Sequence, residues 1–123
     1  MKRMAILLPD LRPGGAQTVM VRVANGLVAR GHSISLIVLD GVGELKSELD
    51  PRLDYEELGC KRARYAFLSI LRALRVKNPS TVISTSGRLN ILAILAKPFV
   101  QSIFVIRQAT SLSVVRGIEW ILY

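Results

Sequence analysis

The chain has 123 residues, of which 50% are hydrophobic and 21% are charged. This composition fits one globular domain with its own core, and it excludes a disordered chain or a pair of ordinary domains. The single cysteine, Cys60, excludes an internal disulfide and fits a reducing compartment, and a formal net charge of +8 points to an anionic partner.

The first forty residues predict a strand, a helix and a second strand. Residues 4–8 are a continuous apolar run, as in a buried parallel strand, and residues 9–15 are a loop rich in proline and glycine. Residues 16–30 have a helical period that Gly31 ends, and residues 33–39 predict a second buried strand. The expected inner face of this helix consists of Val19, Val23, Leu27 and Val28, with Met20 and Ala24 beside them. Together these segments predict a right-handed βαβ unit.

Strands and helices continue to alternate in the rest of the chain. The expected elements are a short polar helical piece at 44–50, a weak strand at 53–58, a helix at 64–76, a strand at 81–85, a helix at 88–97, a strand at 102–106 and an amphipathic segment from 114 to 123. The expected inner face of the helix at 64–76 consists of Phe67, Ile70, Leu71 and Leu74. The helix at 88–97 is apolar almost all round, so we expect it to be well buried. This order predicts an α/β fold, a Rossmann-like three-layer sandwich with a mainly parallel sheet.

The loop after the first strand is the most informative local feature. It reads Arg12-Pro13-Gly14-Gly15-Ala16-Gln17 and lies at the carboxyl edge of the sheet, where open α/β folds bind ligands. Two glycines allow backbone N–H groups to approach a ligand, and the start of the next helix favours a phosphate. A turn with a helix cap is the structural alternative. The glycine spacing does not match a dinucleotide fingerprint, and no Gly-Lys-Ser/Thr follows as in a P-loop.

Several stretches carry a family resemblance. They are Met4-Ala5-Ile6-Leu7-Leu8, Pro13-Gly14-Gly15-Ala16-Gln17, Ala24-Asn25-Gly26-Leu27-Val28-Ala29-Arg30-Gly31-His32-Ser33-Ile34, Val82-Ile83-Ser84-Thr85-Ser86 and Phe104-Val105-Ile106-Arg107-Gln108. Together they resemble the N-terminal domain of the family-4, GT-B type, retaining glycosyltransferases.

The resemblance implies that residues 1–123 are the acceptor-side, Rossmann-like domain of such an enzyme. The C-terminal domain, which in this family binds most of the nucleotide-sugar and carries paired glutamates, is absent from the sequence, so we expect the chain alone to be inactive. The implied reaction is transfer of a sugar from a nucleotide-sugar to a saccharide or lipid-linked acceptor in the synthesis of cell-surface polysaccharide or glycan. It implies no cofactor, and the nucleotide-sugar is the substrate.

Candidate site residues follow from the strand ends and the resemblance. Gly14 and Gly15 are the candidate donor diphosphate site, where backbone amides would meet charge on the leaving group. The acceptor-side candidates are Gln17, Ser86, Arg88, Arg107 and Gln108. No catalytic residue is assigned, because the amide of Gln108 cannot act as a general base, and no metal site is expected.

Two further polar residues invite a functional interpretation. His32, the only histidine, precedes the second predicted strand at the opposite edge of the sheet, and it is interpreted as a turn residue. Asp40 follows the second strand, where a ribose-binding acid would lie in a dinucleotide domain, and it is interpreted as a strand-end residue.

Basic residues gather on one side of the helix at 64–76. The candidate membrane-surface residues are Lys61, Arg64, Arg72 and Arg75, with Lys77 added beyond the last turn. This pattern is typical of a helix that lies on anionic lipid, and an ordinary solvated helix would also produce it. Nucleic acid is not an expected partner, since the sequence has no zinc pattern, helix-turn-helix signal or aromatic RNA-binding motif. No signal peptide or spanning segment is expected, so the predicted location is cytoplasmic, with at most peripheral attachment to the inner face of the membrane.

Two other functions stay open at this point. One is a non-catalytic, membrane-associated subunit that docks a separate catalytic domain. The other is an NAD-type Rossmann domain, which the glycine spacing disfavours.

Overall fold

The computed structural model describes residues 3–59, 63–84, 87–100 and 103–106, with the side chains of 63–65, 87–88 and 103–106 excluded. Its elements are β1 (Arg3–Leu8), α1 (Gly15–Ala29), β2 (Ser33–Val38), the 3-10 helix η1 (Glu44–Glu48), β3 (Asp54–Glu57), α2 (Ala63–Lys77), β4 (Thr81–Ser84), α3 (Gly87–Ala96), the 3-10 helix η2 (Lys97–Phe99) and β5 (Ile103–Ile106). The predicted element order is confirmed as far as β5. The predicted segment 114–123 lies outside the described residues.

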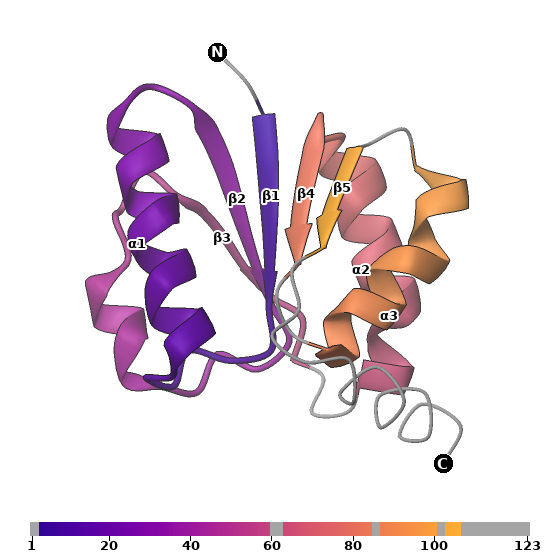
Figure 1. The fold of residues 1–123 in the computed structure, drawn as a ribbon, viewed down its shortest axis with the longest axis horizontal. Coiled ribbons are helices and arrows are strands. Elements are labelled where there is room, and N and C mark those ends of the chain that lie inside the picture. Colours follow the sequence, from indigo (N-terminus) through magenta and orange to yellow (C-terminus); the bar gives the residue numbers. More distant parts are fainter. Residues whose placement is uncertain (1–2, 60–62, 85–86, 101–102, 107–123) are drawn as a thin grey trace.

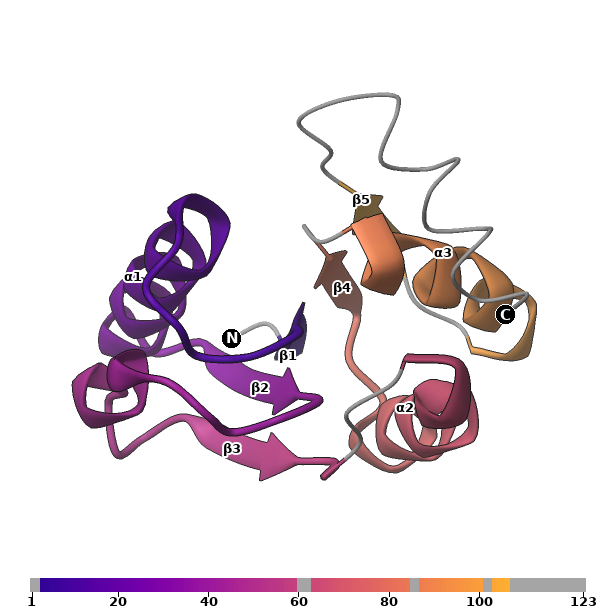
Figure 2. The same ribbon diagram turned by 90° about the horizontal axis from the view of Figure 1, so that it is seen from below.

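The described strands form one all-parallel sheet in the order β3-β2-β1-β4-β5. The central strand β1 pairs with β2 on one side and with β4 on the other, so that Leu7 lies opposite both Ile37 and Ser84. The helix α1 covers one face of the sheet, and α2 and α3 cover the other (Figure 1; Figure 2). The predicted α/β fold, a Rossmann-like three-layer arrangement with a parallel sheet, is confirmed.

The two faces of β1 explain why the sheet is covered on both sides. Successive side chains of a strand point to opposite faces, and all four residues from Ala5 to Leu8 are at most 1% exposed. Ala5 and Leu7 belong to the core formed with α2 and α3, while Ile6 and Leu8 belong to the core formed with α1 and η1. Burial of one leucine or isoleucine side chain contributes about 1.5–3 kcal/mol. A continuous apolar run in the sequence therefore becomes a strand between two cores.

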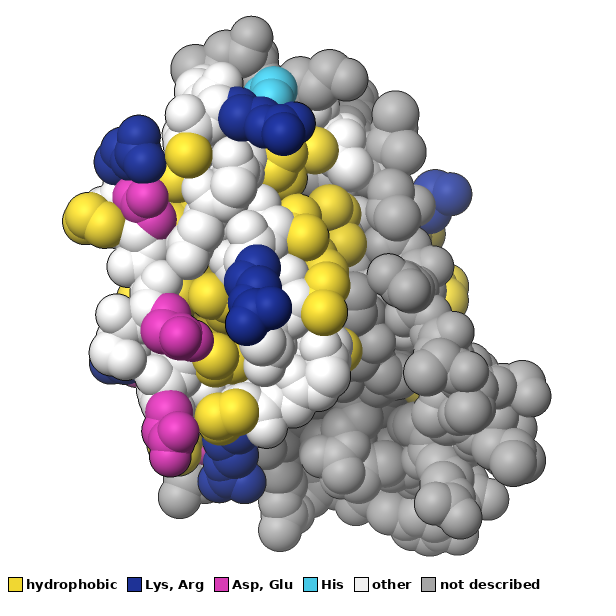
Figure 3. Space-filling model, turned by 60° about the vertical axis from the view of Figure 1, so that its left-hand side comes forward, with side chains coloured by type: hydrophobic (Ala, Val, Ile, Leu, Met, Phe, Trp, Pro, Cys, Tyr) yellow, Lys and Arg dark blue, Asp and Glu magenta, His cyan; other side chains and the backbone are white. Residues whose placement is uncertain are grey.

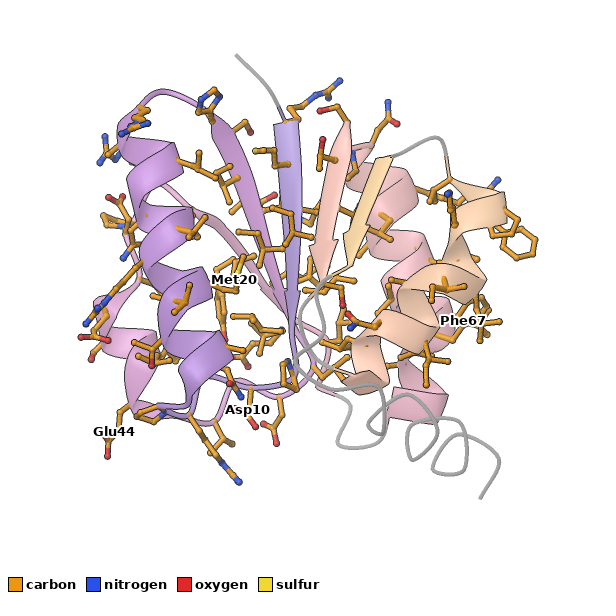
Figure 4. The ribbon with its side chains drawn as sticks, in the orientation of Figure 1. Asp10, Met20, Glu44 and Phe67 are labelled. Carbon is orange, nitrogen blue, oxygen red and sulfur yellow. The ribbon has the colours of Figure 1, made fainter. Side chains whose placement is uncertain are left out.

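The predicted inner face of α1 is wrong in part. Met20, Val21, Ala24 and Val28 are buried, whereas Val19 is 49% exposed and Val23 is 38% exposed. Met20 lies between α1 and the sheet (Figure 4). The contact is centred on Ala24, whose small side chain allows the helix to approach the sheet closely. The valines flank this contact, and apolar side chains accordingly reach the surface on this side of the molecule (Figure 3).

Helix α3 is less buried than its composition predicts. Leu89, Leu92 and Ala96 are buried, but Ile94 and Leu95 are about half exposed. The reason is its place in an outer layer, where only one side of the helix meets the sheet and α2. In the described ranges no helix combines the length and the apolar character that crossing a bilayer requires.

Helix α2 ends at Lys77, one residue beyond the predicted end and directly before the predicted stop at Asn78. Asn78 has a φ of 44°, and its N–H donates to the carbonyl of Leu74 at 2.9 Å, which is a left-handed helix end. Of the predicted inner residues, Ile70 and Leu74 are buried, while Phe67 and Leu71 are half-buried.

The segment between η1 and β3 is attached to α1 by a side-chain clip. The Asn25 amide donates to the carbonyl of Glu48 at 2.8 Å and accepts from the N–H of Asp50 at 3.0 Å. The Asp50 carboxylate in turn accepts from the backbone N–H of Arg52 at 2.9 Å and from its guanidinium at 3.0 and 2.8 Å. These bonds fix the entry into β3.

We expect the Asp50 carboxyl to titrate well below an ordinary aspartate. The hydrogen bonds from the Arg52 side chain, and next those from its backbone N–H, lower the pKa of Asp50 from 3.8 to about 2. Because the folded-state pKa is depressed, the stabilising contribution is complete above the unfolded-state value and is lost as the pH falls toward about 2. A carbon-detected NMR titration of the carboxyl group measures this, and a midpoint at the ordinary value would contradict the contact with Arg52.

Candidate functional site

The order of the strands places a topological switch point between β1 and β4. After β1 the chain passes to α1 on one face of the sheet, and after β4 it passes to α3 on the other face. Both helices begin at the carboxyl edge, at the lower end of the strands in Figure 1. Ligands of open α/β sheets bind at such a switch point, so this edge is the candidate site.

The start of α1 presents free backbone donors at this edge. Gly14 is the N-cap residue in an extended conformation, and no side chain caps the helix. The first helical bond runs from the N–H of Thr18 to the carbonyl of Gly14 at 2.9 Å. Among the described residues nothing accepts a hydrogen bond from the N–H groups of Gly15, Ala16 or Gln17. Three donors and the positive end of the helix dipole are therefore available to an anion.

The fold itself does not require glycine at either position of the pair. The positive-φ glycines of the described chain are Gly31, Gly43 and Gly59, and neither Gly14 nor Gly15 is among them. A Cβ on Gly15 would meet nothing within 4 Å, and one on Gly14 would be tight only against the flexible tip of Gln17. Glycine at these positions would instead allow a ligand to approach the backbone closely.

The loop that carries the glycine pair is held by the segment after β2. Leu11 is fully buried, its N–H donates to the carbonyl of Val42 at 3.0 Å, and its carbonyl accepts from the N–H of Leu45 at 2.9 Å. Gly43, with a φ of 144°, passes so close that a Cβ would overlap the backbone of Leu11 and Arg12. The start of α1 is thus positioned by backbone contacts between two loops.

Gln17, a predicted acceptor-side residue, is engaged within the loop. Its amide donates to a carboxylate oxygen of Asp10 at 3.2 Å, and the N–H of Arg12 donates to the same oxygen at 3.0 Å. Asp10 lies at the end of β1 beside the start of α1 (Figure 4). Gln17 therefore helps to close the loop, and its contact with an acceptor stays a prediction.

Acidic groups occupy the β2–β3 side of the same edge. Glu57 accepts from the Tyr55 hydroxyl at 2.6 Å and from the Lys46 ammonium at 2.9 Å, and these bonds lower the pKa of Glu57. Burial and then the carboxylates of Glu57 and Asp40 raise the pKa of Tyr55, so its hydroxyl stays protonated. Since this side is negative and internally paired, an anion is favoured on the β1–β4 side, next to Gly15.

Several predicted residues cannot be placed at this site by their side chains. Ser86, Arg107, Gln108, Lys61 and Cys60 lie outside the described residues. Arg88 belongs to the first turn of α3 by its backbone, which puts it at the carboxyl edge, but its side chain is not described. His32 precedes β2 and lies at the opposite edge, as the sequence predicts.

Two buried polar residues near the edge were not singled out from the sequence. Ser84 ends β4 and Asn90 lies in the first turn of α3, and each is 1% exposed. The Ser84 hydroxyl has no hydrogen-bond partner within the described part of the chain. Buried polar atoms are normally paired, so this position is unusual. The available signal was a serine directly after Val82 and Ile83, and an asparagine within the otherwise apolar run 89–96.

The described ranges contain no group of three or more His, Cys, Asp or Glu residues able to hold a metal ion. Neither protein-family models nor curated proteins yield a match for this chain.

Proposed function

We propose that this chain is the acceptor-side, Rossmann-like domain of a GT-B type glycosyltransferase. In this proposal the domain works with a second, nucleotide-sugar-binding domain, in the same chain or in a separate one. The reaction is transfer of a sugar from a nucleotide-sugar to a saccharide or lipid-linked acceptor in the cytoplasm. The chain itself provides the acceptor side and one contact to the donor diphosphate.

The observation that carries the proposal is the uncapped start of α1 at the switch point. The N–H groups of Gly15, Ala16 and Gln17 have no acceptor among the described residues, and the surface at Gly15 is open. A diphosphate leaving group gains negative charge as its bond to the sugar breaks. Backbone donors fixed before the reaction stabilise that charge without reorganisation, which is the form of catalysis that such an arrangement supports.

The strand order and the loop contacts add support. The order β3-β2-β1-β4-β5 places α1 and α3 on opposite faces of the sheet and brings both of their starts to one edge. The buried side chain of Leu11 and its two backbone bonds hold the loop before α1 in place. A contact to the leaving group therefore comes from a fixed element, as catalysis by positioning requires.

The proposal predicts that the second phosphate of a nucleotide matters for binding. We expect UDP or GDP to bind the chain at least tenfold more tightly than UMP or GMP, because a diphosphate offers more negative charge and more acceptor oxygens to the amides at the start of α1 while the base stays the same. Calorimetry with the four nucleotides measures the ratio. Equal binding of mono- and diphosphates would contradict the proposal.

The same titration separates the two alternatives. An NAD-type domain would bind NADH in preference to UDP and GDP, which the glycine spacing argues against. A non-catalytic docking subunit would bind none of these nucleotides.

A further inference from the structure

Charge is distributed unevenly along the chain and across the sheet. Residues 1–57 contain seven Lys or Arg and eight Asp or Glu. Residues 58–123 contain ten Lys or Arg and one Asp or Glu. The first part supplies α1 and η1, and the second supplies α2, α3 and η2, which contain no acidic residue. Because α1 and the pair α2–α3 cover opposite faces of the sheet (Figure 2), the helices α2, α3 and η2 form a layer with basic residues and no acidic residue within its described helices.

The outer side of α2 combines arginines with exposed aliphatic side chains. Leu68 is 72% exposed and Val76 is 79% exposed. Arg72 and Arg75 follow Leu68 by four and seven residues, so they share its side of the helix, and both are exposed. The opposite side, with Ile70 at its centre, packs on the sheet. Packing of the layer against the sheet does not require large apolar side chains that are mostly exposed next to arginines.

Lys77, predicted to join this basic surface, does not belong to it. Its ammonium lies 2.6 Å from a carboxylate oxygen of Asp54 and 3.6 Å from one of Glu56, and its side chain is only 16% exposed. Helix α2 continues through Lys77, one residue beyond the predicted end, and the Lys77 side chain contacts the carboxylates of β3. The lysine pairs with Asp54 and Glu56 of β3, whereas Arg72, Arg75 and Lys97 are exposed among the described side chains of this layer.

The exposed surface continues onto α3 and η2. Leu95 is 50% exposed and Phe99 is 55% exposed, and they lie four residues apart. Phe99 and Arg75 line one shallow groove of about 260 Å³ between the end of α2 and η2. Arg72 and Val76 line a second groove, whose other border carries Glu56 and Glu57. We call the exposed residues of this layer the basic–apolar face: Leu68, Arg72, Arg75, Val76, Leu95 and Phe99.

We propose that the basic–apolar face binds the surface of an anionic lipid bilayer. Its arginines match lipid phosphates, and its aliphatic and aromatic side chains match the boundary between headgroups and acyl chains. The arginines would also suit a nucleic acid, but exposed leucine and valine on a helix face would contribute nothing to its binding. Binding on this face leaves the start of α1 free, since α1 lies on the other face of the sheet. The inference does not depend on the proposed transferase function.

The test is co-sedimentation of the full chain with phosphatidylcholine vesicles, with and without phosphatidylglycerol. The variant is Arg72→Gln with Arg75→Gln, and the matched control is Arg22→Gln with Arg30→Gln. The control pair is exposed on and beside α1 and gives the same change of net charge on the opposite face. Each arginine near the lipid surface contributes about fivefold to binding, so we expect the first variant to lower partitioning onto anionic vesicles by about 25-fold. We expect the control variant to lower it by less than about threefold.

The apolar part is tested separately. Leu68→Ser with Val76→Ser should lower partitioning at least fivefold, whereas Val19→Ser with Val42→Ser, which are about half exposed elsewhere, should not. Equal losses in variant and control pairs would show a nonspecific charge effect and overturn the proposal. So would equal binding to neutral vesicles, or loss of oligonucleotide binding with unchanged vesicle binding in the arginine variant.

Discussion

Replacement of Gly15 by proline should lower the affinity of the chain for pyrophosphate by about ten- to one-hundredfold while the fold stays intact. Proline removes one backbone N–H, and a hydrogen bond to a charged group contributes about 1.5–3 kcal/mol. Gly15 is the first residue of α1, and Gly14 before it is extended, with φ −145° and ψ 168°. These are the conditions that proline tolerates at a helix start. The substitution therefore deletes a single donor in an otherwise unchanged helix.

The matched control for this variant is Gly26→Ala. Gly26 lies in the same helix, is exposed, and a Cβ there would meet nothing within 4 Å. We expect alanine to stabilise the helix by about 1 kcal/mol and to leave pyrophosphate affinity unchanged. Calorimetry gives the affinities, and thermal unfolding shows that both variants fold. Equal affinity of Gly15→Pro and the parent chain would mean that this amide contacts no phosphate.

Gly43→Ala should lower the free energy of unfolding by about 3 kcal/mol or more. Gly43 has a φ of 144° and ψ of 156°, a conformation that is essentially restricted to glycine and costs a side chain about 1–3 kcal/mol. A Cβ would also overlap the backbone of Leu11 and Arg12, which cannot move aside as a flexible side chain can. Urea unfolding followed by circular dichroism measures the loss. Since small domains are stable by about 5–15 kcal/mol, the effect is large.

Gly31→Ala is the control for a positive-φ glycine that has no close contact. Gly31 also has a positive φ, 92°, but a Cβ there would meet nothing within 4 Å. We expect a loss of about 1 kcal/mol from the conformation alone. If Gly43→Ala were no more destabilising than Gly31→Ala, Gly43 would not be in the close contact described with Leu11 and Arg12. The loop that carries Gly14 and Gly15 would then not be held in place by the segment after β2.

The order of the elements could be predicted from the sequence because each strand is a short apolar run between breakers. The inner face of α1 could not be predicted as reliably. The apolar residues of α1 extend around more than one side of the helix. The helical period alone therefore does not decide whether Val23 or Ala24 faces the sheet. Close packing on the small side chain of Ala24 decides it.

The candidate site could likewise be predicted only in part from the sequence. The place of the glycine pair follows from its position after β1, because parallel strands end at a common edge. The bond between Gln17 and Asp10, and the ion pair between Lys77 and Asp54, join segments whose relative position depends on the packed sheet. No local pattern encodes either contact, so the sequence left the roles of Gln17 and Lys77 open or wrong.

The most direct measurement of the proposed anion site is a ¹⁵N–¹H NMR titration of the chain with inorganic pyrophosphate. We predict that the amide signals of Gly15, Ala16 and Gln17 shift most and saturate together. Larger shifts in the arginine-bearing part of α2, with the start of α1 unmoved, would contradict the account, because they would place the bound anion on the opposite layer.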